Sequence, residues 1–243
     1  MKQYGLIGFP LSHSFSKGYF KEKFEREKIT DAVYDVFPLE RMELFRHLCE
    51  REENLAGLNV TIPYKEQIIP YLDELDEEAK AIGAVNTIKF TKGKKIGYNS
   101  DGFGFEKSLQ PLLKPQHTAA LILGTGGASK AVVYVLQKLG IPFQFISRNK
   151  SKNTITYQEL DDAVVRESTL IVNCSPVGMH PHTQEAPDIP YQVLTDKHLL
   201  YDLIYNPDET LFLKYGKMRH AQTKNGLEML YLQAERSWEI WNR

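Results

Sequence analysis

The chain has 243 residues, of which 42% are hydrophobic and 25% charged, a balance typical of a globular protein that buries a sizeable core. Its 30 basic and 31 acidic residues give a net charge of −1, which argues against nucleic acid as a partner. Two cysteines can form neither a disulfide framework nor a cysteine-rich zinc site. The apolar runs are too short for a signal peptide or a membrane span, so we expect a cytoplasmic protein without a membrane partner.

Short apolar runs alternate with amphipathic stretches along most of the chain, which indicates an α/β fold. In the first hundred residues we expect helices over 14–28, 41–51 and 64–72. Pro63 suits the start of the third helix. The strands expected in this region are residues 4–8, 33–37, 57–61, 85–90 and 95–99.

A second series of elements begins near Gly102. Its apolar runs are nearly continuous, as in parallel strands that are buried on both faces. The polar segment 149–167 is short for a full crossover helix, so we expect an abbreviated connection there. The elements expected in this series are strands over 121–123, 143–147, 170–173 and 200–204, with a helix over 130–139.

The end of the chain predicts a helix over 227–241. Its apolar residues recur at intervals of three and four and therefore share one buried face. They are Leu227, Leu230, Ala234, Trp238 and Trp241. Met229 and Gln233 lie beside this stripe.

A glycine cluster lies between the expected strand at 121–123 and the helix after it. Its members are Gly124, Thr125, Gly126, Gly127, Ala128 and Ser129. Glycines at the first and third positions allow a tight turn and the close approach of a pyrophosphate, whose charge a helix N-terminus favours. Because Ser129 stands where the motif has glycine or alanine, an ordinary glycine turn is the alternative.

The end of the next strand bears on the choice of nucleotide. Enzymes that use NAD usually place Asp or Glu there, whereas this chain has Ser147, Arg148 and Asn149. A guanidinium can pair with a 2′-phosphate through two hydrogen bonds. The loop therefore favours NADP over NAD, with a solvated basic loop as the alternative.

Two polar clusters, residues 59–65 and 99–102, each lie at the end of an expected strand and the start of a helix. In an open α/β sheet such ends line the ligand crevice. Lys65 and Asp101 could there exchange a proton with a substrate hydroxyl. A surface ion pair is at least as compatible with the sequence.

A hydroxyl-rich run, residues 12–16, enters the first helix. Its serines could cap that helix, or they could bind a polyol or a carboxylate. His180 and His182 lie on a proline-rich loop without a third ligand nearby, so we expect no metal.

Read together, these clusters resemble the shikimate dehydrogenase family over nearly the whole chain. One such block would be a weak signal, whereas eight in the family's order are specific. The blocks are GFPLSHSFS at 8–16, LNVTIPYKE at 58–66, AVNT at 84–87, NSDGFGF at 99–105, LGTGGASKA at 123–131, VNCSPVGM at 172–179, YDLIYNPDET at 201–210 and NGLEMLYLQA at 225–234.

The resemblance implies a substrate-binding α/β domain over 1–100, completed by the helix 227–243, and a Rossmann-like dinucleotide-binding domain over 101–226. It implies NADP-dependent reduction of 3-dehydroshikimate to shikimate, on the pathway to aromatic amino acids. The implied partners are small molecules, bound by a monomer or a homodimer.

The resemblance also implies roles for individual residues. Lys65 and Asp101 match the family's catalytic pair. The family's substrate contacts match Ser14, Ser16, Thr61, Asn86, Tyr205 and Gln233. Gly124 to Ser129 match its phosphate turn and Ser147 to Asn149 its adenosine loop. The nicotinamide lining matches Leu203, Gly226 and Met229.

The chain departs from the family pattern in places: Lys17 replaces a common proline, Ser100 replaces the usual threonine, and Ser147-Arg148-Asn149 replaces Asn-Arg-Thr. These changes leave the implied reaction intact, and those at 147–149 alter the residues that match the family's adenosine contacts. Two other functions stay open: a quinate/shikimate dehydrogenase that uses NAD, and a catalytically silent nucleotide-binding regulator.

Overall fold

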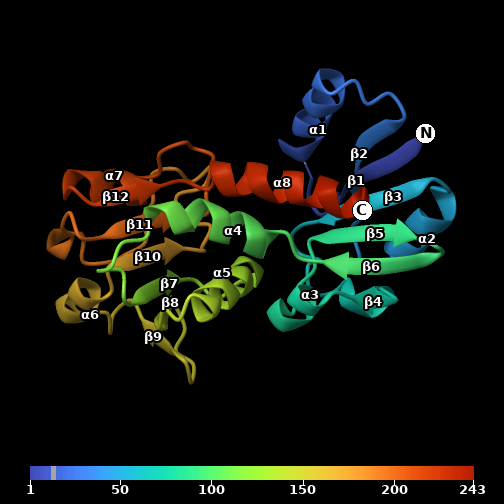
Figure 1. Cartoon of the computed structure of the whole chain (residues 1–243). Coiled ribbons are helices and arrows are strands. Elements are labelled where there is room, and N and C mark those ends of the chain that lie inside the picture. The colour runs from blue at the N-terminus through green and yellow to red at the C-terminus, as the bar shows by residue number, and fades with distance from the viewer. Residues whose placement is uncertain (12–14) are drawn as a thin grey trace. The chain divides into compact units, whose positions relative to one another are not determined.

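The computed structural model describes residues 1–11 and 15–243, and the chain divides into two compact units (Figure 1). Unit 1 comprises Met1–Ser100 and Gln233–Arg243, and unit 2 comprises Asp101–Leu232. Each unit has its own six-stranded sheet with helices packed on it, which confirms the α/β fold class. The chain returns to unit 1 at Gln233, inside the last helix. That one domain binds substrate and the other the cofactor stays a prediction.

The sheet of unit 1 is mixed and has the order β2-β1-β3-β5-β6-β4. β1 pairs in parallel with both β2 and β3, whereas β5 is antiparallel to β3 and to β6. The strands are β1 (Lys2–Gly8), β2 (Ala32–Pro38), β3 (Leu55–Val60), β4 (Glu74–Leu75), β5 (Thr87–Thr91) and β6 (Lys94–Tyr98). The carboxyl ends of β1 and β3 therefore lie at one edge of the sheet, together with the beginning of β5.

Helices cover both faces of this sheet: α1 (Phe15–Arg26) and the end of α8 (Leu227–Trp241) on one face, and α2 (Leu44–Arg51) on the other. Side chains of a strand alternate between faces, so Tyr4 packs with the first group and Ile7 with the second. Trp241 lies against β3 at Gly57, where an added Cβ would come within 2.2 Å of its Nε1. That Nε1 donates to the carbonyl of Ile88 over 2.9 Å.

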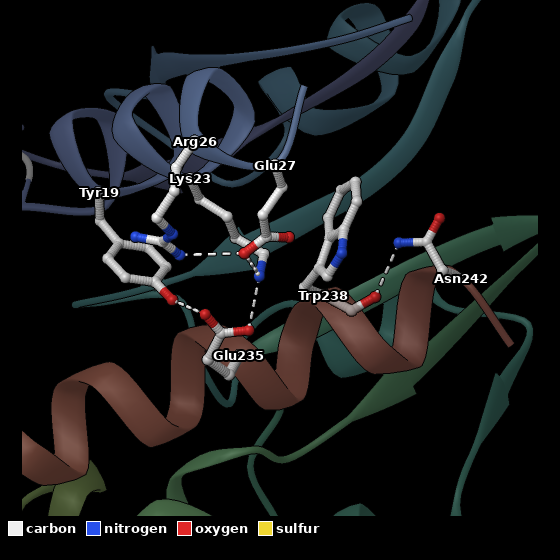
Figure 2. A network of polar contacts seen from close by, with 7 residues as sticks. All are labelled: Tyr19, Lys23, Arg26, Glu27, Glu235, Trp238 and Asn242. Atoms are coloured by element: carbon white, nitrogen blue, oxygen red, sulfur yellow. Dashed lines mark hydrogen bonds and ion pairs between the residues drawn. The ribbon is translucent and has the colours of Figure 1, made fainter. Parts of the chain in front are cut away.

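A polar network also holds α8 against α1 (Figure 2). Lys23 is buried, yet its ammonium reaches Glu235 on α8 at 2.7 Å and Glu27 on its own helix at 2.9 Å. Tyr19 donates a further hydrogen bond to Glu235. A buried charge without a partner is strongly unfavourable, so these carboxylates are needed to keep Lys23 inside. The C-terminal helix is thus docked on unit 1 by both apolar and ionic contacts.

The helix predicted over 64–72 is wrong. Residues 62–68 form turns, followed only by a short 3₁₀ helix, Ile69–Tyr71. Two physical reasons account for it. The carbonyl of Lys65 accepts from the backbone of Val85 over 2.7 Å and so is used outside the segment. Pro70 has no N–H to donate to the turn before it.

The sequence reasoning also missed α3 (Glu77–Ile82), although its boundary signals are present. The side chain of Asp76 caps it by accepting from the backbone of Ala79 over 2.8 Å, and Gly83 ends it at φ +70°. The other elements that were not predicted are the strands β4, β9 (Thr154–Thr156) and β12 (Gln222–Lys224) and the helix α7 (Leu211–Met218).

The sheet of unit 2 is entirely parallel, with the order β12-β11-β10-β7-β8-β9. This is the strand order of doubly wound dinucleotide-binding folds. Leu121 and Leu123 pack on one face and Ala120 and Ile122 on the other, so the strand is buried on both faces, as predicted. The remaining strands are β7 (Ala120–Leu123), β8 (Phe143–Ser147), β10 (Leu170–Asn173) and β11 (Leu199–Asp202).

The helices of unit 2 follow its strands, with one interruption. α5 (Gly127–Lys138) connects β7 to β8 and begins three residues before the predicted 130. Residues 148–153, between β8 and β9, contain no helix, and α6 (Asp162–Glu167) has only six residues. The connection is therefore abbreviated, as expected. α4 (Asp101–Leu109) begins the unit. Among the described residues, no helix is both long and apolar enough to cross a membrane.

Candidate active site

The turn that carries Lys65 lies at the carboxyl edge of the unit 1 sheet. Thr61, directly after β3, donates its backbone N–H to Ile7 of β1 over 2.9 Å. Val60 donates to the carbonyl of Asn86 over 2.9 Å, and the Lys65 carbonyl accepts from Val85. Backbone hydrogen bonds thus bring Asn86 to the same edge as the turn that holds Thr61 and Lys65.

Asn86 connects this edge to the last helix. Its side chain is 2% exposed, and its Nδ2 donates to Oε1 of Gln233 over 3.0 Å and to Oγ of Ser100 over 2.9 Å. Its Oδ1 accepts the backbone N–H of Ser100 over 2.7 Å. Gln233 is therefore not merely solvated. It meets a predicted substrate contact that is 147 residues away in the chain.

Three buried hydroxyls lie beneath Asn86, and the sequence reasoning missed them as a group. Thr87, Ser100 and Ser237 are each 0% exposed. Ser237 lies 2.8 Å from the Thr87 hydroxyl and 3.2 Å from that of Ser100, and the latter two are 3.3 Å apart. We call these residues the hydroxyl triangle. The available signal was that Ser237 lies one helical turn after Gln233, on the same face.

The hydroxyl triangle continues toward the first helix. Nδ2 of Asn59 donates to Ser237 over 2.9 Å, and its Oδ1 accepts from the phenol of Tyr34 over 2.8 Å. The Ser16 hydroxyl hydrogen-bonds to the Tyr34 oxygen in turn. Burial raises the pKa of Tyr34, so the phenol stays a donor. Two of the six predicted substrate contacts, Ser16 and Gln233, are thus the partly buried ends of one hydrogen-bonded network. Another, Ser14, lies outside the described residues.

The predicted catalytic pair occupies two elements. Lys65 is half-buried in the turn after β3, and Asp101 is the first residue of α4. Asp101 directly follows Ser100, whose backbone and hydroxyl are both held by Asn86. Lys65 belongs to unit 1 and Asp101 to unit 2, and their joint action stays a prediction.

The glycine cluster forms a turn between β7 and α5. Gly124 has φ +98°, a backbone conformation that favours glycine, and a Cβ there would lie 3.2 Å from the backbone nitrogen of Ser175. Apart from its chain neighbours, no atom of the described residues lies within 4 Å of a Cβ built on Gly126, so the space beside the first turn of α5 is open. A tight turn, open space and a helix N-terminus together fit a pyrophosphate.

Ser129 explains why the glycine motif tolerates a hydroxyl at its last position. The residue is 2% exposed, and its Oγ and backbone N–H both donate to the carbonyl of Gly126, over 2.7 and 2.9 Å. The side chain therefore closes the first turn of α5. Ser129 supports the turn from inside, while Thr125, Gly126 and Gly127 are exposed.

A buried carboxylate joins the ends of β10 and β11, beside the glycine turn. Asp202 accepts from Nδ2 of Asn173 over 3.0 Å, from the backbone of Ile204 over 3.1 Å and from Thr210 over 2.6 Å. Asn173 in turn accepts from the backbone N–H of Ser175, and Ser175 packs against Gly124 of the glycine turn. Burial raises the pKa of Asp202 to about 6, although its hydrogen bonds favour the charged form.

The loop after β8 begins with a basic side chain, that of Arg148. Arg148 is exposed, and none of the described carboxylates forms an ion pair with it. Lys150, by contrast, is paired with Glu159. Ser147 accepts from the backbone of Asn149 over 3.4 Å, which leaves Arg148 at the tip. This arrangement fits a contact of Arg148 with a phosphate.

The residues predicted to line the nicotinamide gather at the end of β11. A Cβ on Gly226 would lie 2.1 Å from the carbonyl oxygen of Leu203, so only glycine lets the two backbones approach. Met229, one turn into α8, packs in the same apolar cluster as Leu203. Tyr205, a predicted substrate contact, follows this strand and is 38% exposed.

The described part of the chain, residues 1–11 and 15–243, contains no group of three or more His, Cys, Asp or Glu side chains that could hold a metal ion. His180 and His182 are exposed on their loop.

Comparison with known proteins agrees with this arrangement. The family model of the shikimate dehydrogenase substrate binding domain matches residues 6–88. The NADP(+)-dependent shikimate dehydrogenase of Desulforamulus reducens is 36% identical, over 98% of this chain and 88% of the relative. The chain belongs to the shikimate dehydrogenase family. The resemblance in the sequence is thereby confirmed.

Solved structures of the family extend the likeness over the whole chain. The shikimate dehydrogenase of Aquifex aeolicus has a TM-score of 0.89 at 35% identity and covers 100% of this chain and 92% of its own. The shikimate 5-dehydrogenase of Thermus thermophilus, solved with NADP(H) and shikimate, has a TM-score of 0.88 at 28% identity, with 99% and 93% covered.

Proposed function

We propose that this chain catalyses the reversible, NADPH-dependent reduction of 3-dehydroshikimate to shikimate, the step implied by its family on the pathway to aromatic amino acids. The observation that carries the proposal is the full-length relationship to NADP(+)-dependent shikimate dehydrogenases. The doubly wound sheet of unit 2 and its open glycine turn support a dinucleotide as the cofactor.

The nicotinamide of NADPH, when bound, supplies the hydride for the substrate carbonyl. Negative charge then develops on the carbonyl oxygen. Lys65, as an ammonium, stabilises that oxygen and delivers a proton to it. Asp101 holds the lysine and accepts a hydrogen bond from the neighbouring substrate hydroxyl. In the reverse direction Lys65 takes the proton from the alcohol.

The remaining predicted contacts bind different parts of the substrate. Ser14 and Ser16, with Tyr205, bind the carboxylate, while Thr61, Asn86 and Gln233 face the ring hydroxyls. The backbone hydrogen bonds from Val60 to Asn86 and from Val85 to Lys65 bring the Thr61–Lys65 turn close to Asn86. Together with the hydrogen bond between Asn86 and Gln233, they support one substrate site for Thr61, Lys65, Asn86 and Gln233.

The cofactor contacts follow from unit 2. Gly124 to Ser129 hold the pyrophosphate, Arg148 with Ser147 and Asn149 holds the adenosine 2′-phosphate, and Leu203, Gly226 and Met229 line the nicotinamide. The lack of a carboxylate partner for Arg148 supports NADP over NAD. The partners of the chain are these small molecules. A cytoplasmic location, a monomeric or homodimeric state, and the lack of nucleic-acid or membrane partners stay predictions.

The test is the absorbance of the reduced nicotinamide, recorded with shikimate or quinate and with NADP or NAD in turn. We expect the fastest reduction with shikimate and NADP. Equal or faster turnover of quinate with NAD would favour the broader dehydrogenase. No reduction with any combination, despite a nucleotide-binding signal in calorimetry, would favour the silent regulator.

A further inference from the structure

A backbone donor in unit 1 determines which side-chain atom of Asn86 is the oxygen and which is the nitrogen. The backbone N–H of Ser100 can only donate, and it lies 2.7 Å from the Oδ1 atom of Asn86. The hydroxyl of Thr87 donates to the same oxygen over 3.1 Å. Nδ2 of Asn86 must therefore be the atom that faces Ser100 Oγ and Gln233. The side-chain amide of Asn86 is held in one orientation by its surroundings.

The orientation of Asn86 determines that of Gln233. An amide N–H needs an acceptor, so the Gln233 atom 3.0 Å from Asn86 is the oxygen, Oε1. With its oxygen engaged inside unit 1, Gln233 presents Nε2 on the other side of its amide group. A ligand that meets this residue therefore meets a hydrogen-bond donor.

The hydroxyl triangle stabilises the orientation of Asn86 and Gln233 through the contacts of Ser237. Ser237 accepts from Asn59 and donates its one proton to the backbone carbonyl of Gln233 over 2.9 Å, and its oxygen lies 2.8 Å from the Thr87 hydroxyl. It thus joins the helix that carries Gln233 to β5, the strand that begins directly after Asn86. Because Ser237 is 0% exposed, its hydroxyl has no exchange with solvent to compensate for a lost partner.

We propose that the hydroxyl triangle makes Gln233 an obligatory hydrogen-bond donor to the substrate, and that Ser237 is a positioning residue for this contact. The inference rests on the proposed function and adds to it the polarity of one substrate contact. The ring oxygen at this position must accept a hydrogen bond, which a hydroxyl or a ketone does. An analogue with an ammonium group in its place, which has no acceptor, is rejected.

The first experiment compares Ser237→Ala with Ser108→Ala. Ser108 is a matched control in unit 2, because it is 1% exposed, donates to the carbonyl four residues earlier over 2.7 Å, and shares a hydrogen bond with Tyr201 at 2.6 Å. We expect both variants to lower the melting temperature. Only Ser237→Ala should raise the KM for shikimate, by roughly three- to tenfold, with the KM for NADP kept. An unchanged KM for shikimate, or an equal rise in both variants, would overturn the positioning role.

The second experiment tests the polarity directly and does not depend on a buried position. In Gln233→Glu the carboxylate still accepts from Asn86, but its outer atom becomes an acceptor. We expect shikimate binding, measured by calorimetry relative to wild type at each pH, to weaken at least tenfold at pH 8. Binding should recover toward pH 5 as the carboxyl regains a proton to donate. Binding as tight as that of wild type at pH 8 would show that Gln233 accepts from the substrate.

Wild-type turnover of shikimate with NADP separates the two levels of inference. If the wild type does not turn shikimate over, the proposed function fails. If it does, and Gln233→Glu and Ser237→Ala leave shikimate binding unchanged, the inference about polarity fails alone.

Discussion

The glycine turn of unit 2 and the Asn86 network of unit 1 are assembled in opposite ways. The turn consists of six consecutive residues, Gly124–Ser129, and apart from its chain neighbours no described atom lies near an added Cβ at Gly126. The network joins Asn86 to Gln233, 147 residues away, and Asn59 to Ser237, 178 residues away, and all of these except the partly buried Gln233 are buried.

The difference matches the ligand that we propose for each region, a pyrophosphate at the glycine turn and a polyol ring at the Asn86 network. A pyrophosphate is bound by backbone N–H groups and a helix N-terminus, which local chain geometry alone can supply. A polyol ring requires donors and acceptors of fixed polarity at several points around it. Side-chain amides can be held in one orientation only by neighbours from other strands and helices, as Ser100 holds Asn86. Substitutions in the two regions should therefore fail in different ways.

The largest expected effect concerns the turn beside the Asn86 network. Lys65→Ala should lower kcat by about 10²–10⁴-fold, because the general acid is lost, while shikimate affinity changes less. Steady-state kinetics with saturating NADPH measure this. A variant that keeps more than half of the wild-type kcat would remove Lys65 from the proton transfer. Asp101→Asn should also be severe, since an amide does not pair with the lysine charge.

Unit 2 differs from unit 1 in the group at the centre of its buried polar contacts. This group is the carboxyl of Asp202, whereas in unit 1 it is the hydroxyl triangle. The pKa of Asp202 rises from 3.8 in the unfolded chain to about 6 in the fold, so the folded state binds the proton more tightly. The contribution of this group to stability is therefore greatest below pH 3.8 and is lost as the pH rises to 6, by about 3 kcal/mol in total.

Asp202→Asn should remove this part of the pH dependence. Thermal unfolding of both proteins between pH 4 and pH 7 is the measurement. The melting temperature of the variant, relative to wild type, should rise across that range, whereas an altered hydrogen bond alone produces a constant offset. A constant difference would mean that Asp202 titrates normally in the fold.

Arg148→Ala tests whether a single side chain accounts for the preference for NADP over NAD. A charge-assisted contact contributes roughly 1.5–3 kcal/mol, so NADP binding should weaken by about one to two decades. NAD binding, measured in the same titration series, should stay nearly unchanged. Lys150→Ala is the matched control, because Lys150 is already paired with Glu159. Equal losses of NADP and NAD would assign Arg148 to the support of its loop.

Gln233→Ala should have the smallest effect of these substitutions. It tests whether the Asn86 network of unit 1 contacts shikimate through Gln233. We expect the KM for shikimate to rise roughly three- to tenfold, because one neutral hydrogen bond is lost. NADP affinity and the melting temperature should be nearly kept, since Gln233 is only partly buried. Unchanged shikimate kinetics would exclude the contact, and a large drop in melting temperature would make the residue structural.

The sequence-based predictions succeeded where the signal is local. The glycine cluster between β7 and α5 lies in the predicted context of strand, turn and helix. The apolar stripe of the last helix also appears as predicted, with Ala234 and Trp241 buried against unit 1. The helix expected over 64–72 does not form, because Pro70 has no N–H to donate and the Lys65 carbonyl is hydrogen-bonded to Val85 outside the segment.

What the sequence by itself determined is the α/β class, the position of the glycine turn, the family and the identity of the candidate side chains, because each depends on short segments or on their order. Only the tertiary structure decided which polar groups meet. The hydroxyl triangle joins β5, the residue directly before α4 and the last helix, and no periodicity relates Thr87, Ser100 and Ser237. Such contacts depend on how the strands and helices pack, since a hydrogen bond requires two atoms at about 3 Å whatever their separation along the chain.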